Sequence, residues 1–454
     1  MVALKQEELL SLAEEAVKFA LRNSAAEAEA FAYQGLTTNV SIERGQINKS
    51  ARIIDRGVGI RIIFNRAVGF SYTNILENKD AIEEAIHRAL ASAKASKTDE
   101  NWHSLPDKKP EVSVEDTYDP TVVRLHSEDL VKAASQMLES AEQTDKRILP
   151  IEGGVGASYL STAIANSNGI SCFDQGTVVE CSLATVGQQA NEVTPVCFEF
   201  NAERSYNIDP EWVGKEAARL AASALKARRI DTGSMRLILS QTAFQDLLYF
   251  TLINAVKADF VQRNQSAFKG KIGEKVASEI VTVFDDGLFK GGLRTWKFDG
   301  EGFPQQKTVI IEKGVLRNYI YDNYTAKREG KESTGNATRA GYLSTPSIEA
   351  TNFHFMPGKK SPEELIKEVD SGLLVYSLQG AHSSNPASGE FSVVATPAWK
   401  IEKGEIAYAT KGVMLAGSIF QLLEDISALA SNERKAGQIV APWTCIENVK
   451  VIGK

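Results

Sequence analysis

Four runs of alternating apolar and polar residues between positions 28 and 74 constrain the fold of this chain more than any other feature. They are AEAFAYQ, TTNVSIERGQINKS, GVGIRIIFN and AVGFSYTN, with Gly, Asn and Gln at the breaks. Alternation over short runs is typical of half-buried strands, so the segment predicts an antiparallel meander of short strands. In FNRAVGF, Asn65 and Arg66 stand between two apolar runs and predict a hairpin turn.

Helices are expected on both sides of this meander. The N-terminal sequence MVALKQEELLSLAEEAVKFALRN predicts an amphipathic helix, and its acidic residues distinguish it from a secretion signal. Residues 79–97 predict a second helix, with Ile82, Ile86, Ala89 and Leu90 on one face. No apolar run approaches the ~20 residues that cross a bilayer. We therefore expect a cytoplasmic protein with no membrane partner.

The length of 454 residues predicts two or three domains. Residues 97–121 are rich in Pro, Asp, Lys and Ser and are interpreted as a linker on the surface. A helix from Ser127 to Gln143, a β-rich stretch and a helix from Pro210 to Arg229, capped by Asp209, then repeat the order of the first unit. No clear sequence repeat accompanies this order, so duplication stays open.

The third unit predicts a short strand near residue 233, a helix from Gln241 to Lys257 and mostly strands beyond Ile280. Two Glu-Lys-Gly segments between alternating arms predict hairpins. Further helices are expected from Ser361 to Asp370, with Ser361 and Glu364 as a capping box, and from Ser418 to Ser431.

The predicted fold class is α+β and multidomain, with meander units followed by a β-rich domain. The expected domains are an N-terminal α+β domain at 1–100, a middle α+β domain with its linker at 101–230 and a β-rich C-terminal domain at 231–454.

Charge and cysteine content narrow the function. The formal net charge is -7, and the basic residues are scattered, which argues against a nucleic-acid partner. The four cysteines form no C-x-x-C pair and are interpreted as buried free thiols in a reducing compartment.

Composition and spacing alone identify no active site. The five histidines form no H-E-x-x-H helix. The pairs Asp285-Asp286 and Asp299/Glu301 have the chemistry of acid-base groups or cation ligands, but carboxylates in surface loops are the more common alternative.

Several segments of the third unit resemble the TldD/PmbA family, also described as peptidase U62 or modulator of DNA gyrase. They are FKGKIGEKVASE from Phe268, FDDGL, FDGEG, IEKGVLRNYIYDNYTAKREG, STGNATR and SGEFS, in the order of the family. GVGIRIIFNRAVGFSYT resembles the family's N-terminal β segment, so the resemblance covers most of the chain. It implies a metallopeptidase, in whose catalytic branch H-E-x-x-x-H binds zinc and supplies a general base.

Counting back from Phe260 and Phe268, the three motif places fall on Tyr249, Phe250 and Asn254. None of these side chains replaces a zinc-binding imidazole or a basic carboxylate. The catalytic branch also uses a cysteine from a late loop, but Cys445 lies in the predicted closing strand. The pattern therefore resembles the PmbA/TldE-type branch, in which this chain holds no metal and no catalytic residue and the zinc is expected in a TldD-type partner.

The sequence leaves three hypotheses. The first is a metal-free subunit that shapes the substrate channel of a zinc peptidase acting on unfolded or small peptides, with peptide added as a strand to a sheet edge. The second is a peptidase whose own site is built from distant residues such as His354, His382, Asp285 and Glu301. The third is a homo-oligomeric regulatory or peptide-binding protein, a homodimer when alone.

Overall fold

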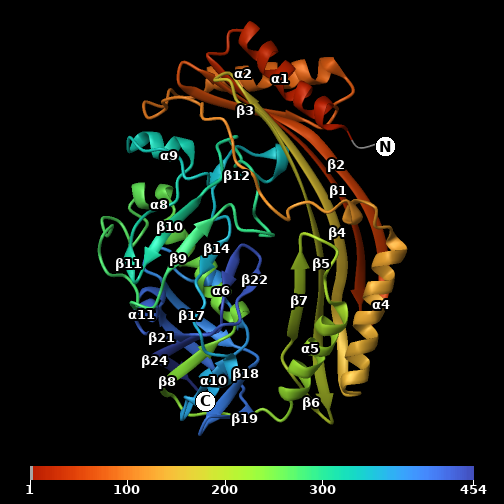
Figure 1. The fold of residues 1–454 in the computed structure, drawn as a ribbon, viewed down its shortest axis with the longest axis vertical. Coiled ribbons are helices and arrows are strands. Elements are labelled where there is room, and N and C mark those ends of the chain that lie inside the picture. The colour runs from red at the N-terminus through yellow and green to blue at the C-terminus, as the bar shows by residue number, and fades with distance from the viewer. Residues whose placement is uncertain (1–3, 454) are drawn as a thin grey trace.

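The computed structural model describes residues 4–453 and shows one curved antiparallel sheet shared by the first two predicted units (Figure 1). Its order is β3-β2-β1-β4-β5, with β6 and β7 both paired to β5. The first strand of each unit lies at the centre, because β1 pairs with β4 from Glu29 opposite Asn166 to Glu43 opposite Glu152. The strands are β1 Glu27–Glu43, β2 Gln46–Phe64, β3 Ala67–Thr73, β4 Ile148–Asn166, β5 Ser171–Gln189, β6 Glu192–Val193 and β7 Cys197–Glu203.

The prediction of short strands is wrong, since β1 has 17 residues and β2 has 19. The glycines of GVGIR do not end β2. A Cβ atom on Gly57 or Gly59 would lie 2.4 or 2.5 Å from atoms of Tyr342, so these glycines let the C-terminal domain approach the sheet. The hairpin at Asn65-Arg66 is confirmed, because both residues have positive φ and Phe64 pairs with Ala67.

The two faces of the sheet carry different side chains, as the period of two requires. Along β1, Ala28, Ala30 and Ala32 pack against helices. Glu29 and Phe31 point to the other side and contact the C-terminal domain. The helices of these two units are α1 Gln6–Arg22, α2 Lys79–Ala95, α3 Pro120–Val123, α4 Ser127–Thr144 and α5 Pro210–Ser223. The first residues of the predicted N-terminal helix, 1–3, lie outside the described residues.

Helix α5 begins at the predicted cap, where the Asp209 side chain accepts a hydrogen bond from the N–H of Trp212. It ends earlier than predicted, at Ser223. The helix packs closely against α4 at Gly214, where an added Cβ would lie 2.0 Å from the carbonyl oxygen of Met137. The absence of a side chain therefore sets the distance between these two helices.

We expect the substitution Gly214→Ala to destabilise the protein by about 1–3 kcal/mol, because the added methyl group forces α4 and α5 apart. The higher helix propensity of alanine, about 1 kcal/mol, acts in the opposite direction and is too small to compensate. Urea denaturation measures the change. Lys215→Ala, on the exposed face of the same helix, is the matched control and is expected to have little effect. A Gly214→Ala protein as stable as the native one would contradict this account of the helix contact.

The linker is more firmly held than its composition indicates. Residues 96–119 form no helix or strand, yet Trp102 and Leu105 are buried beside Ile63. The carboxylate of Glu27 accepts hydrogen bonds from the indole N–H of Trp102 at 2.9 Å and from the backbone N–H of Leu105 at 2.6 Å. The prediction of a segment wrapped on the surface is thus only partly right.

The C-terminal domain contains two larger sheets and a two-stranded ladder, β12-β13. One has the order β16-β17-β20-β24-β8-β15-β18-β19, with β21 also paired to β24, and the other β11-β10-β9-β14-β23-β22. The pairs β8-β15 and β14-β23 are parallel. The strands are β8 Gly233–Leu239, β9 Val283–Asp286, β10 Lys307–Glu312, β11 Val315–Leu316, β12 Ala337–Thr338, β13 Ser347–Ile348, β14 Phe353–Phe355, β15 Ser371–Val375, β16 Leu378–Gln379, β17 Glu390–Ala395, β18 Ala398–Glu402, β19 Glu405–Ala409, β20 Met414–Ser418, β21 Ile426–Leu429, β22 Arg434–Ala436, β23 Ile439–Ala441 and β24 Thr444–Ile452.

The helices of this domain are shorter than predicted. They are α6 Gln241–Phe250, α7 Leu252–Val256, α8 Ala258–Gln262, α9 Asn323–Arg328, α10 Pro362–Lys367 and α11 Ile419–Glu424, with 3-10 turns η1 Gly341–Leu343 and η2 Ala381–Ser383. The capping box of Ser361 and Glu364 is confirmed, as are both Glu-Lys-Gly hairpins, where Lys313 and Lys403 have positive φ. The predicted late helix is wrong beyond Glu424, because the following residues pair as β21 with β24.

The predicted helix from Gln241 to Lys257 is interrupted at Thr251, whose φ of -123° and ψ of -74° are not helical. Its hydroxyl donates to the carbonyl of Leu247, a bond that competes with regular helix geometry and bends helices. Tyr249 and Phe250 therefore end α6, and Asn254 belongs to α7.

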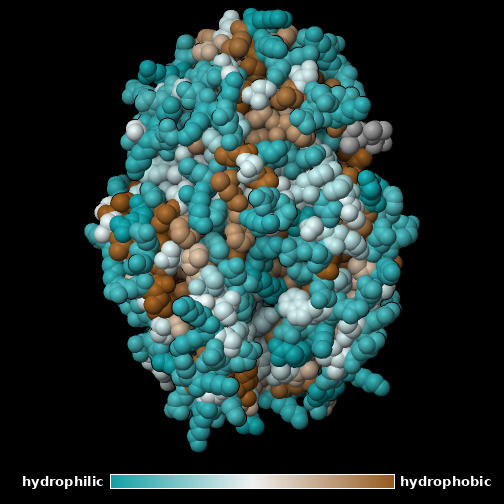
Figure 2. Space-filling view, viewed as in Figure 1, coloured by the Kyte–Doolittle hydropathy of each residue, from teal (hydrophilic) through white to brown (hydrophobic). Residues whose placement is uncertain are grey.

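Figure 2 shows that the face seen in Figure 1 is mostly hydrophilic, with its apolar residues in separate small patches. Within residues 4–453, no helix is long and apolar enough to cross a membrane.

Candidate functional site

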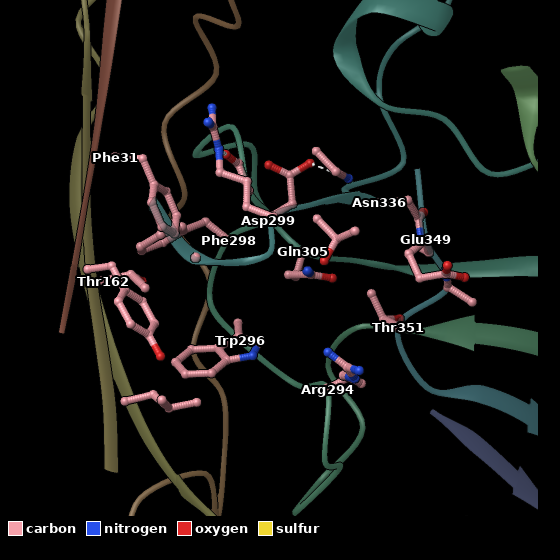
Figure 3. Close-up of a pocket in the computed structure, with 18 residues that line it drawn as sticks. Phe31, Thr162, Arg294, Trp296, Phe298, Asp299, Gln305, Asn336, Glu349 and Thr351 are labelled. Atoms are coloured by element: carbon pink, nitrogen blue, oxygen red, sulfur yellow. Dashed lines mark hydrogen bonds between the residues drawn. The ribbon is translucent and has the colours of Figure 1, made fainter. Parts of the chain in front are cut away.

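The sheet and the C-terminal domain line two cavities between them. The first, here called the Asp246 cavity, has a volume of about 610 Å³ and is bounded by β5, β7 and α6. The second, the Arg294 cavity, has a volume of about 190 Å³ and is bounded by β1, β4 and loops of the C-terminal domain (Figure 3). Ligand sites commonly occur between domains, so both cavities are candidate sites.

Alternate side chains of two strands line one wall of the Asp246 cavity. Val178, Glu180 and Ser182 of β5 face the cavity together with Phe198 and Phe200 of β7. The intervening residues of β5, Val179, Cys181 and Leu183, pack on the opposite side against α4 and α5. The two phenylalanine rings are stacked, with centroids 5.9 Å apart, and give the cavity an aromatic wall.

Helix α6 contributes Thr242, Gln245 and Asp246 to the opposite wall. Burial raises the pKa of the Asp246 carboxyl group to about 6, and a hydrogen bond of 3.4 Å from the backbone N–H of Leu378 opposes the rise only weakly. A carboxyl group that faces a cleft and whose pKa burial has strongly shifted is a candidate for a functional role. Asp246 is such a group. Nothing in the sequence singles it out, because it belongs to no recognisable motif.

We expect Asp246→Asn to stabilise the protein at pH 8 by about 1–3 kcal/mol, because the neutral amide avoids burying a charge and still accepts the Leu378 hydrogen bond. Since the folded-state pKa is raised, the ionised carboxylate destabilises the fold above it. The gain is therefore largest at alkaline pH, shrinks as the pH falls through 6 and is gone by about pH 4. Thermal denaturation at a series of pH values tests this, with the exposed Asp107→Asn as control. A gain independent of pH would contradict the assigned cause.

Two of the three positions singled out in the sequence, Tyr249 and Phe250, lie one turn beyond Asp246 in α6, and the third, Asn254, lies in α7. Tyr249 is 39% exposed, and its ring packs against Phe250 with a centroid distance of 4.9 Å. Phe250 packs against the core of the C-terminal domain and against the ring of His382, 6.4 Å away. The amide of Asn254 donates to the carbonyl of Phe250 at 3.3 Å.

This arrangement does not fit the zinc that the family implies. Phe250 has no donor atom, and Tyr249 and Asn254 offer a phenol and an amide oxygen, which are not the usual ligands of zinc. Zinc sites are built from Cys, His and carboxylate groups, and the structure brings no three such residues together as a metal-binding group anywhere from residue 4 to 453. We therefore derive no chemical step through a metal at these positions.

The distant residues of the second hypothesis are not brought together. Asp285 lies opposite Phe353 and His354 opposite Phe284, so Asp285 and His354 are on opposite faces of the sheet. His354 is bonded to Glu433 at 2.8 Å. His382 is exposed beside Phe250, and the structure gives it no contact with the other three.

The interpretation of the acidic pairs as surface carboxylates is wrong, because all four are buried. Asp285 accepts hydrogen bonds from Asn336, from the backbone N–H of Thr351 and from its hydroxyl, and burial raises its pKa to about 6. Asp299 accepts three backbone N–H groups, and burial and the neighbouring Glu301 raise its pKa. These carboxylates organise loops.

Ion pairs hold the two walls of the cleft together. The guanidinium of Arg61 on β2 donates to Glu29 of β1 and to Glu301 of the C-terminal domain, each at 2.8 Å. Arg339 also binds Glu29. Burial alone would lower the pKa of Arg61, but the two carboxylates raise it. A second buried ion pair joins β7 to the C-terminal domain. There the carboxylate of Glu199 accepts hydrogen bonds from Arg434 at 2.6 Å and from the hydroxyl of Tyr376.

The cysteines supply no reactive thiol to this site, although Cys181 is among the residues that line the Asp246 cavity. Cys181, Cys197 and Cys445 are buried free thiols, as expected, and Cys172 is half-buried. Burial raises the pKa of Cys181 and of Cys197 to about 12, which keeps both as unreactive thiols.

The fold and the cleft define a class, a multidomain α+β protein in which a curved antiparallel sheet faces a β-rich C-terminal domain. Three family models match in order, PmbA/TldA metallopeptidase domain 1 at residues 28–93, the central domain at 120–225 and the C-terminal domain at 232–453. The chain belongs to the PmbA/TldA metallopeptidase family, and the resemblance found in its sequence is confirmed.

Relatives agree over nearly the whole chain. The TldE structure from Thermococcus kodakarensis is 30% identical, covers 97% of this chain and 99% of its own, and has a TM-score of 0.92. The uncharacterized protein MJ0231 of Methanocaldococcus jannaschii is 30% identical over 92% of this chain and 94% of its own length. Metalloprotease PmbA of Escherichia coli O157:H7 is 24% identical over 92% of this chain and 91% of its own.

Proposed function

We propose that this chain is the metal-free subunit of a TldD/TldE-type zinc peptidase complex that cleaves unfolded or small peptides. In this proposal a TldD-type partner supplies the zinc and the catalytic base, and this chain shapes the substrate channel. The observation that carries the proposal is the end of α6, where half-buried Phe250 packs against the core and neither Tyr249 nor Asn254 is a usual zinc ligand.

The cleft supports a role in holding peptide. Strand β16, Leu378–Gln379, pairs only with β17 among the described residues, and its Leu378 lines the Asp246 cavity. The Leu378 N–H is already bonded to Asp246, and the other outward backbone groups of this edge strand could bind the backbone of an extended peptide while the cavity takes its side chains. Substrate would then lie along α6, towards the partner's metal.

Co-expression with a TldD-type protein from the same organism tests the proposal. Size-exclusion chromatography should show a complex of the two chains, and the complex should cleave an unfolded peptide faster than the partner alone, while this chain alone cleaves nothing. The variant Phe198→Ala removes one of the two rings of the aromatic wall and should slow cleavage without preventing assembly.

Two results would count against the proposal. If neither a complex nor stimulated cleavage is observed, the chain is not such a subunit. A homo-oligomer that binds peptide without any partner would favour the regulatory or peptide-binding alternative.

A further inference from the structure

The Arg294 cavity combines an apolar wall with a polar one. Phe31 of β1 and Leu160 of β4 line it on the side of the sheet, with Phe298 beside them. Figure 3 shows Arg294, Glu349 and Thr351 on the opposite side, with Trp296 between Arg294 and the sheet residues in this view. The cavity is thus apolar on the side of the sheet and polar on the side of the C-terminal domain.

Most charged groups around this cavity are already paired. Glu349 is bonded to Lys257 at 2.8 Å and accepts a hydrogen bond from Gln438. Arg339 binds Glu29 and the carbonyls of Gly300 and Ser344. The Asp299 carboxylate is occupied by backbone N–H groups, as described above.

Arg294 is the exception. Its guanidinium forms no hydrogen bond or ion pair with any residue from 4 to 453; only its backbone N–H is engaged, with Asn352. It also lies near Arg204, whose pKa is lowered to about 10, first by burial and also by the charge of Arg294. Arg294 is exposed, so water solvates its guanidinium at the opening of the cavity. An unpaired cation beside a second cation makes this end of the cavity suited to an anion.

Two further polar groups are unsatisfied there. Gln305 is 5% exposed, and its side-chain oxygen has no partner. The indole N–H of Trp296 also has no hydrogen-bond partner within the described chain, while its ring stacks under Arg204 at 5.1 Å. Gln305 is the buried group of the two, and its free atom is an acceptor, whereas the indole of half-buried Trp296 and the Arg294 guanidinium donate. Buried polar groups are normally hydrogen-bonded, so a ligand that donates to the Gln305 oxygen and accepts from the indole and the guanidinium would complete the site.

We propose that the Arg294 cavity binds the C-terminal residue of a peptide, with its free carboxylate on Arg294 and Trp296 and an apolar side chain against Phe31 and Leu160. A volume of about 190 Å³ is below the ~300–1,000 Å³ of drug-sized pockets, so one terminal residue fills it and the rest of the peptide extends through its opening. The choice of a peptide as carrier of the carboxylate rests on the proposed function.

Isothermal titration of the full chain, without any partner, tests this site. The probe is acetyl-Ala-Ala-Phe, used as the free acid and as the C-terminal amide. The acid should bind at least about tenfold more tightly than the amide, the size expected for a hydrogen bond to a charged group. Arg294→Gln should remove this preference. Lys290→Gln, an exposed cation of the same loop outside the cavity, should keep it.

Equal binding of acid and amide, no binding of either, or an unchanged preference in Arg294→Gln would overturn the proposal. A simple carboxylate, 3-phenylpropanoate, should bind more weakly than the peptide acid. If it binds equally well, the site is one for small carboxylates and the peptide assignment is wrong. None of these outcomes requires zinc or cleavage, so the cavity and the proposed subunit role can fail separately.

Discussion

Replacing Arg61 by alanine is expected to lower the free energy of unfolding by about 3–5 kcal/mol, because it leaves the buried Glu301 without its cation and Glu29 with Arg339 alone. The side chains of Glu29 and Glu301 are each 1% exposed, and that of Arg61 is 6% exposed. The three groups join the first strands of the sheet to the C-terminal domain, so their loss also weakens one wall of the cleft. Urea denaturation at pH 7 measures the change.

The pH dependence of this loss has a definite sign. Burial raises the pKa of Glu301, and Arg61 counteracts that rise. Without Arg61 the folded-state pKa rises further, so the ionised carboxylate costs most at neutral and alkaline pH. The deficit of Arg61→Ala should therefore shrink as the pH falls and Glu301 becomes protonated.

Arg52→Ala is the matched control, because Arg52 lies on the same strand but is exposed. It should change stability by no more than about 0.5 kcal/mol. If Arg61→Ala behaves like Arg52→Ala, the buried network does not hold the sheet to the C-terminal domain.

The second large effect is expected at Arg434, where alanine should cost about 2–4 kcal/mol by leaving Glu199 buried beside Tyr376. The Glu199 side chain is 1% exposed. Arg434 also stacks on Phe200, its Cζ 4.5 Å from the ring centroid, and that ring lines the Asp246 cavity. Denaturation reports the loss of stability, and the double variant with Glu199→Gln should recover part of it.

The neighbouring pair of Lys435 and Glu203 offers a control on the same two strands. Both of its side chains are more than a fifth exposed, and water solvates the charge that is left behind. Lys435→Ala should therefore cost about 1 kcal/mol or less. Equal losses of stability for Arg434→Ala and Lys435→Ala would show that burial does not determine the strength of these ion pairs.

Local features of the fold could be predicted because nearby residues determine them. The turn at Asn65-Arg66 and the Lys403-Gly404 hairpin follow from positive φ at the turn residues, and the Ser361 capping box is complete within four residues. The α+β class follows from the same local patterns. The pairing of β1 with β4 could not be read this way, because its partners are more than a hundred residues apart and no turn joins them.

Some residues of the candidate site could likewise be predicted from the sequence, and others could not. The sequence could mark Tyr249, Phe250 and Asn254 only because matched flanking segments fixed their register. No local pattern distinguishes Asp246 or Arg294 from other charged residues, since Asp246 is buried only by distant parts of the fold and Arg294 differs only in having no partner for its guanidinium among residues 4–453. Thr251 was predicted to continue its helix, but its bond to the Leu247 carbonyl interrupts it. Burial and pairing across domains, which periodicity does not encode, decided these outcomes.

Metal analysis tests the central claim most directly. The chain purified alone and its complex with a TldD-type partner would be loaded with zinc, passed through a desalting column and analysed for bound metal. Our account predicts no stoichiometric zinc in the chain alone and about one zinc per pair of subunits in the complex. Stoichiometric zinc retained by the chain alone would contradict it.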